Sequence, residues 1–322
     1  MTQTLDEAAN PYMFLVGCPR SGTTLLQRML DAHPSLAVAN DTHFITHAAK
    51  TALRHADNPS LTQELLDAVL KYKRFYRMGL EEREVRETAA RCKDYAEFVS
   101  RLYTLRAKGL GKTLSGEKTP DYCRQVPALA KLFPAAKFVH ILRDGRDVAL
   151  SLADWANKGK GPGRWASWEW DKLGTCALSW RWQVLQGRRD GDASAASRYY
   201  ELHYESLVSD PKNTLRNLAK FLRLNNVASM VNYHVGKTRS KPGLSPKSAW
   251  LPATSGLRDW RTQMQREDVE VFEELAADAL EVFGYERASE GPTPEAKSRA
   301  RKLKRWWQSQ KMARALGEYE GD

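Results

Sequence analysis

Residues 12–24 of this chain read YMFLVGCPRSGTT. The apolar run 12–16 predicts a buried strand, and the glycine-containing turn that follows leads into an apolar helix. A helix N-terminus behind such a turn binds anions, because its first backbone N–H groups have no partner within the helix. Two glycines separated by four residues match the nucleotide-binding P-loop, but Thr23-Thr24 stands where the ATP-binding version has lysine followed by serine or threonine. We therefore expect a phosphate cradle for a nucleotide whose terminal group differs from that of ATP.

Strands and helices alternate along the rest of the chain. The expected strands are 12–17, 36–39, 137–142 and 198–204, and the expected helices are 22–32, several within 44–110, one after Asp144, one from Asp210-Pro211 and one over 269–283. This order predicts an α/β fold with a P-loop NTPase-like central parallel sheet, flanked by helices on both faces, and a ligand at the carboxyl ends of the strands. We expect one domain over 10–288 and a basic helical tail over 289–322.

The composition adds three expectations. The formal charge of +11 favours anionic partners. Four scattered cysteines match neither a zinc site nor a disulfide framework, and residues 1–11 lack the basic start of a secretory signal. No apolar run approaches the length of a membrane span. A reducing, cytoplasmic setting fits these features.

The tail helix, about 295–316, places Ala300, Leu303 and Trp307 on one side among many basic residues. A basic amphipathic helix can lie on an anionic membrane. It can equally dock on its own domain or on a sister subunit in a homodimer. We favour docking or solvation over membrane contact.

Four segments resemble, in order, those of sulfotransferases that use 3′-phosphoadenosine 5′-phosphosulfate, in their tyrosylprotein and heparan sulfate branches. The segments are 19–25, 117–122 (Glu-Lys-Thr-Pro-Asp-Tyr), 143–148 with Ser151, and 204–208 followed by Asp210-Pro211. The resemblance spans about residues 12–224 and implies an enzyme of the soluble bacterial type. It also implies adenosine 3′,5′-bisphosphate as the second product and no required metal.

The resemblance assigns the donor site residue by residue. Its members are Arg20, Ser21, Gly22, Thr23 and Thr24 for the 5′-phosphosulfate, Arg143 and Ser151 for the 3′-phosphate, and Tyr204 near the adenine. The loop 237–255 is expected to close over the nucleotide, with Ser245 and Lys247 as contacts. Arg146 is expected to form a structural ion pair.

The chemistry needs a cation for the leaving oxygen and a base for the acceptor. Sulfuryl transfer involves less charge than γ-phosphoryl transfer, so the loop amides, Arg20 and a lysine can replace Mg²⁺; Lys118 is the candidate. Asp41 falls where both branches have a glutamate base, although its side chain is one methylene shorter. His43 is the alternative base or an orienting partner, because its unperturbed pKa suits proton transfer. A helix cap at Asp41 beside a packed His43 remains the non-catalytic alternative.

We therefore expect sulfuryl transfer to a hydroxyl, or to an amine, of a small-molecule, glycan or lipid acceptor. A small-molecule kinase on the same scaffold is the second hypothesis, but it needs the absent lysine and a metal-binding acid, for which Asp144 is the only candidate. The third hypothesis is a membrane-surface or nucleic-acid binding protein that acts through its basic tail, with nucleic acid the less favoured partner.

Overall fold

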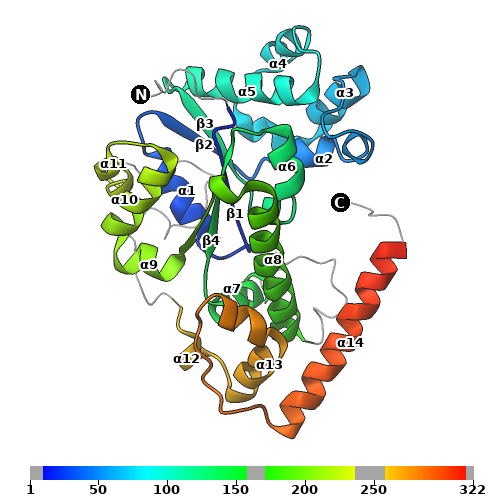
Figure 1. Ribbon diagram of the computed structural model, residues 1–322, viewed down its shortest axis with the longest axis vertical. Coiled ribbons are helices and arrows are strands. Elements are labelled where there is room, and N and C mark those ends of the chain that lie inside the picture. The colour runs from blue at the N-terminus through cyan, green and yellow to red at the C-terminus, as the bar shows by residue number, and fades with distance from the viewer. Residues whose placement is uncertain (1–9, 158–170, 236–257, 317–322) are drawn as a thin grey trace. The chain divides into compact units, whose positions relative to one another are not determined.

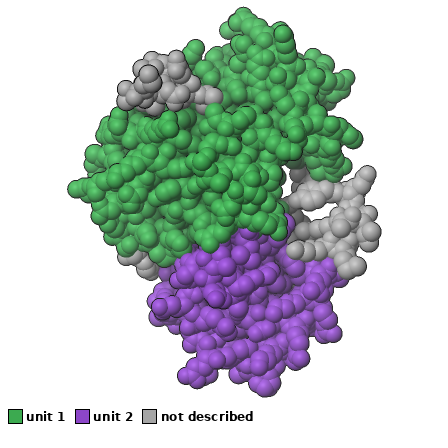
Figure 2. Space-filling view, in the orientation of Figure 1, with its two compact units in different colours: residues 1–142, 186–255 green, residues 143–185, 256–322 purple. Residues whose placement is uncertain are grey.

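The computed structural model describes residues 10–157, 171–235 and 258–316 (Figure 1). The chain forms two compact units, one from residues 1–142 and 186–255 and the other from residues 143–185 and 256–322 (Figure 2).

The first unit contains a five-stranded parallel sheet in the order β2-β3-β1-β4-β5. Its strands are β1 (Met13–Gly17), β2 (Leu36–Asn40), β3 (Leu114–Lys118), β4 (Lys137–Leu142) and β5 (Tyr199–His203). Helices lie between consecutive strands along the chain, as parallel pairing requires. The predicted α/β fold with a central parallel sheet is confirmed.

Helices cover both faces of this sheet because the central strands are apolar on both sides. Phe14 and Val16 of β1 belong to one buried cluster, whereas Met13 and Leu15 belong to the other. The first cluster includes α2 (Phe44–Ala48), α3 (Gln63–Lys71), α4 (Glu82–Ala89), α5 (Tyr95–Gly109) and α6 (Val126–Leu132); the second includes α1 (Thr23–Asp31), α9 (Tyr204–Ser209), α10 (Pro211–Leu222) and α11 (Val227–Val231). The sheet is therefore the middle of three layers.

The strand β3 was not predicted. Its sequence, Leu114-Ser-Gly-Glu-Lys, has one large apolar residue, yet all five residues are buried. Gly116 allows close packing, because a Cβ at this position would lie 2.6 Å from the backbone oxygen of Met13. Hydrogen bonds to the Glu117 carboxylate and an ion pair at Lys118 compensate for burying these two residues, whereas the buried Ser115 hydroxyl has no hydrogen-bond partner among the described residues. At Glu117 and Lys118, polar partners from distant segments therefore replace the apolar side chains that normally mark a buried strand.

Short helices connect the elements of the first unit. They are η2 (Ala52–Arg54), η3 (Lys73–Met78), η4 (Pro120–Arg124) and η6 (Ala196–Arg198). The helical region expected over 44–110 is thus confirmed as several separate pieces. The expected cap of α10 is confirmed as well, since an Asp210 carboxylate oxygen accepts the backbone N–H of Asn213 at 3.1 Å.

The second unit is helical in its described part. It contains α7 (Gly145–Asn157), residues 172–185 of α8 (Lys172–Ala195), α12 (Trp260–Gln263), α13 (Arg266–Val282) and α14 (Pro294–Leu316). Arg146 is buried at its centre and bonds to Asp144 at 2.8 Å and Glu273 at 2.6 Å, with its guanidinium 3.6 Å from the centre of the Trp260 ring. The expected structural ion pair at Arg146 is confirmed.

The tail helix α14 packs on its own unit. Ala300, Leu303 and Trp307 are buried along one side, as their spacing predicts. A Cβ at Gly174 of α8 would lie only 2.3 Å from Leu303, and the Trp307 ring meets the Trp182 ring edge-on at 6.1 Å. Its apolar side is therefore covered, in agreement with the docked alternative, whereas membrane contact and a homodimer stay predictions.

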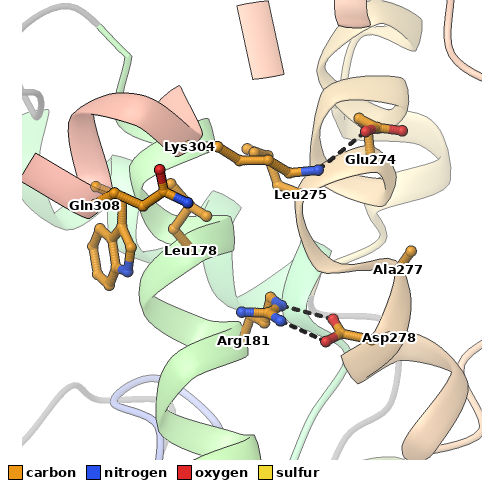
Figure 3. Close-up of a pocket in the computed structure, with 9 residues that line it drawn as sticks. Leu178, Arg181, Glu274, Leu275, Ala277, Asp278, Lys304 and Gln308 are labelled. Carbon is orange, nitrogen blue, oxygen red and sulfur yellow. Dashed lines mark hydrogen bonds and ion pairs between the residues drawn. The ribbon is translucent and has the colours of Figure 1, made fainter. Parts of the chain in front are cut away.

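A pocket of about 440 Å³ lies where α8, α13 and α14 meet (Figure 3). Leu178, Leu275 and Trp307 contribute apolar lining. The ion pairs Arg181–Asp278 and Lys304–Glu274 lie beside it (Figure 3). None of the predicted site residues lines this pocket. Among the helices described, none is both long and apolar enough to cross a membrane.

Candidate active site

Each strand of the parallel sheet leads into a predicted site residue at its carboxyl end. Gly17 ends β1 and starts the loop, Asp41 follows β2, Lys118 ends β3, Arg143 follows β4 and Tyr204 follows β5. The carboxyl ends of parallel strands lie at one edge of a sheet, which is where ligands bind in open α/β folds. The topology therefore gathers the loop, Asp41, Lys118 and Tyr204 at one edge of the first unit; Arg143 and Ser151 belong to the second unit.

The loop between β1 and α1 is shaped by its two glycines. Gly17 and Gly22 have positive φ values of 156° and 92°, and Gly22 is the N-cap of α1. A Cβ at Gly17 would lie 2.6 Å from the backbone oxygen of Ile141, and one at Gly22 would lie 2.4 Å from the ring of Tyr204. Tyr204 therefore packs directly on the predicted phosphate loop, although 182 positions separate them (204 − 22).

The loop residues fit an anionic group. The Ser21 hydroxyl is buried and has no hydrogen-bond partner among the described residues. Arg20 is exposed beside it with φ 75°, and Thr23 and Thr24 begin α1. A buried hydroxyl normally has a partner, so the Ser21 hydroxyl together with the first amides of α1 suits the oxygens of a phosphosulfate.

Lys118 and Asp41 meet in an ion pair. The Lys118 Nζ atom lies 2.9 Å from Asp41 Oδ2; the lysine side chain is 1% exposed and that of the aspartate 31% exposed. Residues Asn40 and Lys118 are paired in register across β2 and β3, which explains how two side chains 77 positions apart come together. The structure thus places the predicted cation and the predicted base side by side.

The segment from Asp41 to His43 has an unusual backbone. Asp41 and His43 have φ values of 55° and 56°, a left-handed conformation that is uncommon for residues with a Cβ. The Asp41 side chain bonds to Lys118, and no side-chain cap is found at the start of α2. The helix-cap alternative for Asp41 is therefore wrong.

The surroundings of His43 change its chemistry. Burial lowers its pKa to about 4; the carboxylates of Asp121 and Asp41 oppose this shift, whereas Arg74 and Arg77 add to it. His43 is therefore neutral at pH 7. The premise that its pKa is unperturbed is wrong, although its role as alternative base stays a prediction.

Arg143 lies two residues before α7, and Ser151 lies within that helix; both belong to the second unit. Both are buried, with exposures of 7% and 6%, and Arg143 Nη2 lies 3.5 Å from Asp147 Oδ2. Asp144 caps α7, since its Oδ1 atom accepts the Arg146 backbone N–H at 2.9 Å. Ser245 and Lys247 lie outside the described residues.

Asp144 is poorly suited to bind a metal. Its carboxylate oxygens accept hydrogen bonds from Arg146 and from the Trp260 indole N–H, at 3.0 Å for the latter. Within the described ranges, no group of three or more histidine, cysteine or acidic residues could hold a metal ion. The carboxylate that the kinase hypothesis needs as a metal ligand is thus already hydrogen-bonded to Arg146 and Trp260.

Two residues beside the site were missed in the sequence. Arg77 of η3 donates from Nη1 to the backbone oxygen of Asp41 at 2.9 Å. Glu117 was quoted only as part of a motif, yet its buried carboxylate accepts the Thr42 backbone N–H at 3.0 Å. The basic run 71–77 is visible in the sequence, but nothing there indicates which of its residues reaches Asp41.

A family model described as "Sulfotransferase family" matches residues 11–228, more than half of the chain. The chain belongs to the sulfotransferase family. Protein-tyrosine sulfotransferase 1 of Danio rerio is 27% identical over 224 residues, which cover 66% of this chain and 53% of that protein. A putative protein-tyrosine sulfotransferase of Caenorhabditis briggsae is 23% identical over 290 residues, which cover 87% of this chain and 91% of that protein. The matched part of this sulfotransferase-family chain thus spans about half the length of the Danio rerio relative.

Solved structures of sulfotransferases share the fold. The sulfotransferase domain of the Synechococcus PCC 7002 olefin synthase has a TM-score of 0.58 and 21% identity, covering 85% of this chain and 94% of that one. Mouse sulfotransferase SULT7A1, complexed with PAP, has a TM-score of 0.50 and 15% identity, covering 95% of this chain and 92% of that one. At such identities the likeness establishes the fold of this sulfotransferase-family member.

Proposed function

We propose that this chain is an enzyme that transfers a sulfuryl group from 3′-phosphoadenosine 5′-phosphosulfate to a hydroxyl, or to an amine, of an acceptor. Family membership supports the donor, and the ion pair between Lys118 and Asp41 carries the assignment of roles. These two groups lie 2.9 Å apart at the edge of the sheet where the loop also lies. A cation for the leaving oxygen and a base for the acceptor are what in-line transfer requires.

Each part of the site has a defined task in this proposal. The loop amides, Ser21 and Arg20 hold the 5′-phosphosulfate, and Arg143 with Ser151 holds the 3′-phosphate. Asp41 takes the acceptor proton as the new S–O bond forms. The bond from sulfur to the 5′-phosphate oxygen breaks, and Lys118 stabilises the electron pair left on that oxygen. The donor supplies the activated sulfuryl group, so no metal is needed for this chemistry.

Binding of adenosine 3′,5′-bisphosphate tests the donor assignment. We expect this product to raise the unfolding temperature far more than ATP does, since a ligand at 100 times its Kd adds about 2.7 kcal/mol to stability. The activity of this chain should persist in EDTA, whereas a kinase would lose its activity there. No stabilisation by the bisphosphate would refute the proposal.

An acceptor screen tests the reaction itself. Candidate acceptors are incubated with the donor and examined for a mass gain of one sulfuryl group. The protein-tyrosine sulfotransferase names of the relatives put tyrosine-containing peptides in the panel beside small hydroxyl compounds, glycans and lipids. The proposal includes a cytoplasmic setting, which the four free cysteines favour.

A further inference from the structure

The predicted base stands on a backbone turn that is held from two sides. Asp41 and His43 both adopt left-handed φ values, of 55° and 56°, with Thr42 between them. Residues with a Cβ are uncommon in this conformation, although aspartate and histidine adopt it more often than most, and it persists where surrounding groups impose it. The groups that impose it here are therefore part of how the base is positioned.

From the interior, Glu117 holds the turn. Its side chain lies on β3 and is fully buried, and it accepts the Thr42 backbone N–H at 3.0 Å and the Tyr103 hydroxyl at 2.7 Å. The Thr119 hydroxyl donates to the same carboxylate. Burial raises the pKa of Glu117, whereas these hydrogen bonds lower it. Three donors from three different segments therefore hold the carboxylate against the Thr42 N–H.

From the exterior, Arg77 holds the same turn. Its guanidinium donates to the Asp41 backbone oxygen at 2.9 Å, and the arginine itself is exposed on η3. The Asp41 N–H meanwhile donates to the Lys118 backbone oxygen at 2.7 Å. Both peptide groups that flank Asp41 are thus hydrogen-bonded, the Asn40–Asp41 group through its N–H and the Asp41–Thr42 group through its C=O and its N–H.

We propose that Glu117 and Arg77 are positioning residues that hold the turn 41–43 so that the Asp41 carboxylate faces Lys118. This inference rests on the proposed function. Neither residue is among those assigned to the donor. Loss of either should therefore slow transfer, and loss of the exposed Arg77 should do so without weakening donor binding, a pattern that a general loss of structure does not produce.

The test measures release of adenosine 3′,5′-bisphosphate from the donor, with the panel of hydroxyl acceptors and with water alone. Arg77→Ala is the variant that separates positioning from folding, because Arg77 is exposed and the protein should fold without it. We expect a roughly tenfold lower kcat for Arg77→Ala and a roughly 100-fold lower kcat for Glu117→Ala, with an unchanged donor KM for Arg77→Ala. Glu117→Gln keeps an acceptor for the Thr42 N–H and should restore most of the rate. The exposed Arg83→Ala on α4, where Arg83 pairs only with Glu87 among its described contacts, is the matched control.

The outcomes separate the inference from the proposed function. If the wild-type chain neither binds the bisphosphate nor releases it from the donor, the proposed function fails. If the wild-type chain is active but Arg77→Ala and Glu117→Ala keep its kcat, or Arg83→Ala loses as much as Arg77→Ala, the inference alone is overturned. A raised donor KM in Arg77→Ala would likewise contradict a role confined to the base.

Discussion

At the scale of single residues, the site depends on contacts between segments far apart in the sequence. Lys118 and Asp41 are 77 positions apart, and each was chosen from its own motif. Their 2.9 Å ion pair could not be predicted from those motifs, because it follows from the pairing of β2 with the unpredicted β3. Arg77 reaches Asp41 from η3, and the sequence pattern does not predict where this short helix lies relative to β2.

The choice of base can be tested at this scale. Burial removes the advantage of His43, since a pKa of about 4 makes it no stronger a base than an ordinary carboxylate. Asp41 lies beside Lys118, which His43 does not contact among its described interactions. We expect Asp41→Asn to lower kcat by about 10²–10⁴ and His43→Asn to lower it less. Steady-state kinetics at pH 7 would check this, and a larger loss in His43→Asn would reverse the assignment.

The phosphate loop gives a second prediction for single residues. Gly22→Ala places a Cβ 2.4 Å from the Tyr204 ring at a φ of 92°. We expect it to weaken bisphosphate binding and to lower the free energy of unfolding by about 1–3 kcal/mol. Gly109→Ala, where nothing lies within 4 Å of the added Cβ, is the control and should be neutral or stabilising. Calorimetry and urea unfolding measure both effects; equal results for the two variants would contradict the close approach of Tyr204.

At the scale of elements, strands and helices marked by apolar residues were predicted correctly, whereas the polar strand β3 was not. The strand 137–142 is found as expected, and the helices α1, α10 and α13 follow their periodic apolar residues. The strand β3 was missed because Ser115, Gly116 and Glu117 are not the apolar residues that usually mark a buried strand. The Glu117 carboxylate accepts hydrogen bonds from other segments, which only the folded structure supplies.

The strand β4 makes stability depend on pH through His140. This residue is fully buried, and burial lowers its pKa to about 4, although Glu201 opposes the shift. The unfolded chain, with a histidine pKa near 6.5, then binds more protons than the folded chain between pH 6.5 and about 4. The contribution of neutral His140 to the free energy of unfolding is therefore fully present above pH 6.5. It is lost as the pH drops through this window, which lowers the free energy of unfolding by about 3 kcal/mol.

The variant His140→Asn isolates that contribution. Asparagine can keep the hydrogen bond to the Tyr199 hydroxyl but does not titrate. Urea unfolding at several pH values should show a shallower loss of stability between pH 6.5 and 4 than in the wild-type chain. His43 also has a lowered pKa, so the difference between the two curves is the quantity to compare. Parallel curves would show that His140 does not titrate in this way.

The docking of α14 is testable on its buried side. Leu303 is fully buried and reaches Gly174 of α8. We expect Leu303→Ala to lower the free energy of unfolding by about 2–5 kcal/mol, because it leaves a cavity in the helical unit. The exposed Arg301→Ala on the same helix should change it by less than about 0.5 kcal/mol. Urea unfolding of the full chain compares them, and equal stabilities would mean that the helix is not docked.

At the scale of the whole molecule, the question is whether the net charge of +11 takes part in function. The sequence suggests deleting the basic tail to separate an enzyme from a surface-binding protein. The structure makes that deletion unsuitable, because Ala300, Leu303 and Trp307 are part of the buried interior of the second unit. Reversing the exposed charges of α14 changes the electrostatics and leaves those contacts in place.

We therefore predict the effect of Lys297, Arg301 and Arg305 changed together to glutamate. All three are exposed and make no ion pair among the described residues, and the change lowers the formal charge from +11 to +5 (11 − 6). No residue assigned to the donor lies on α14, and exposed charges act only through a field that salt screens within about 8 Å. The bisphosphate Kd should therefore stay within about threefold of the wild-type value at physiological salt. A collapse of bisphosphate binding would show that the basic surface itself holds the anion and would favour the surface-binding alternative over transfer at the sheet edge.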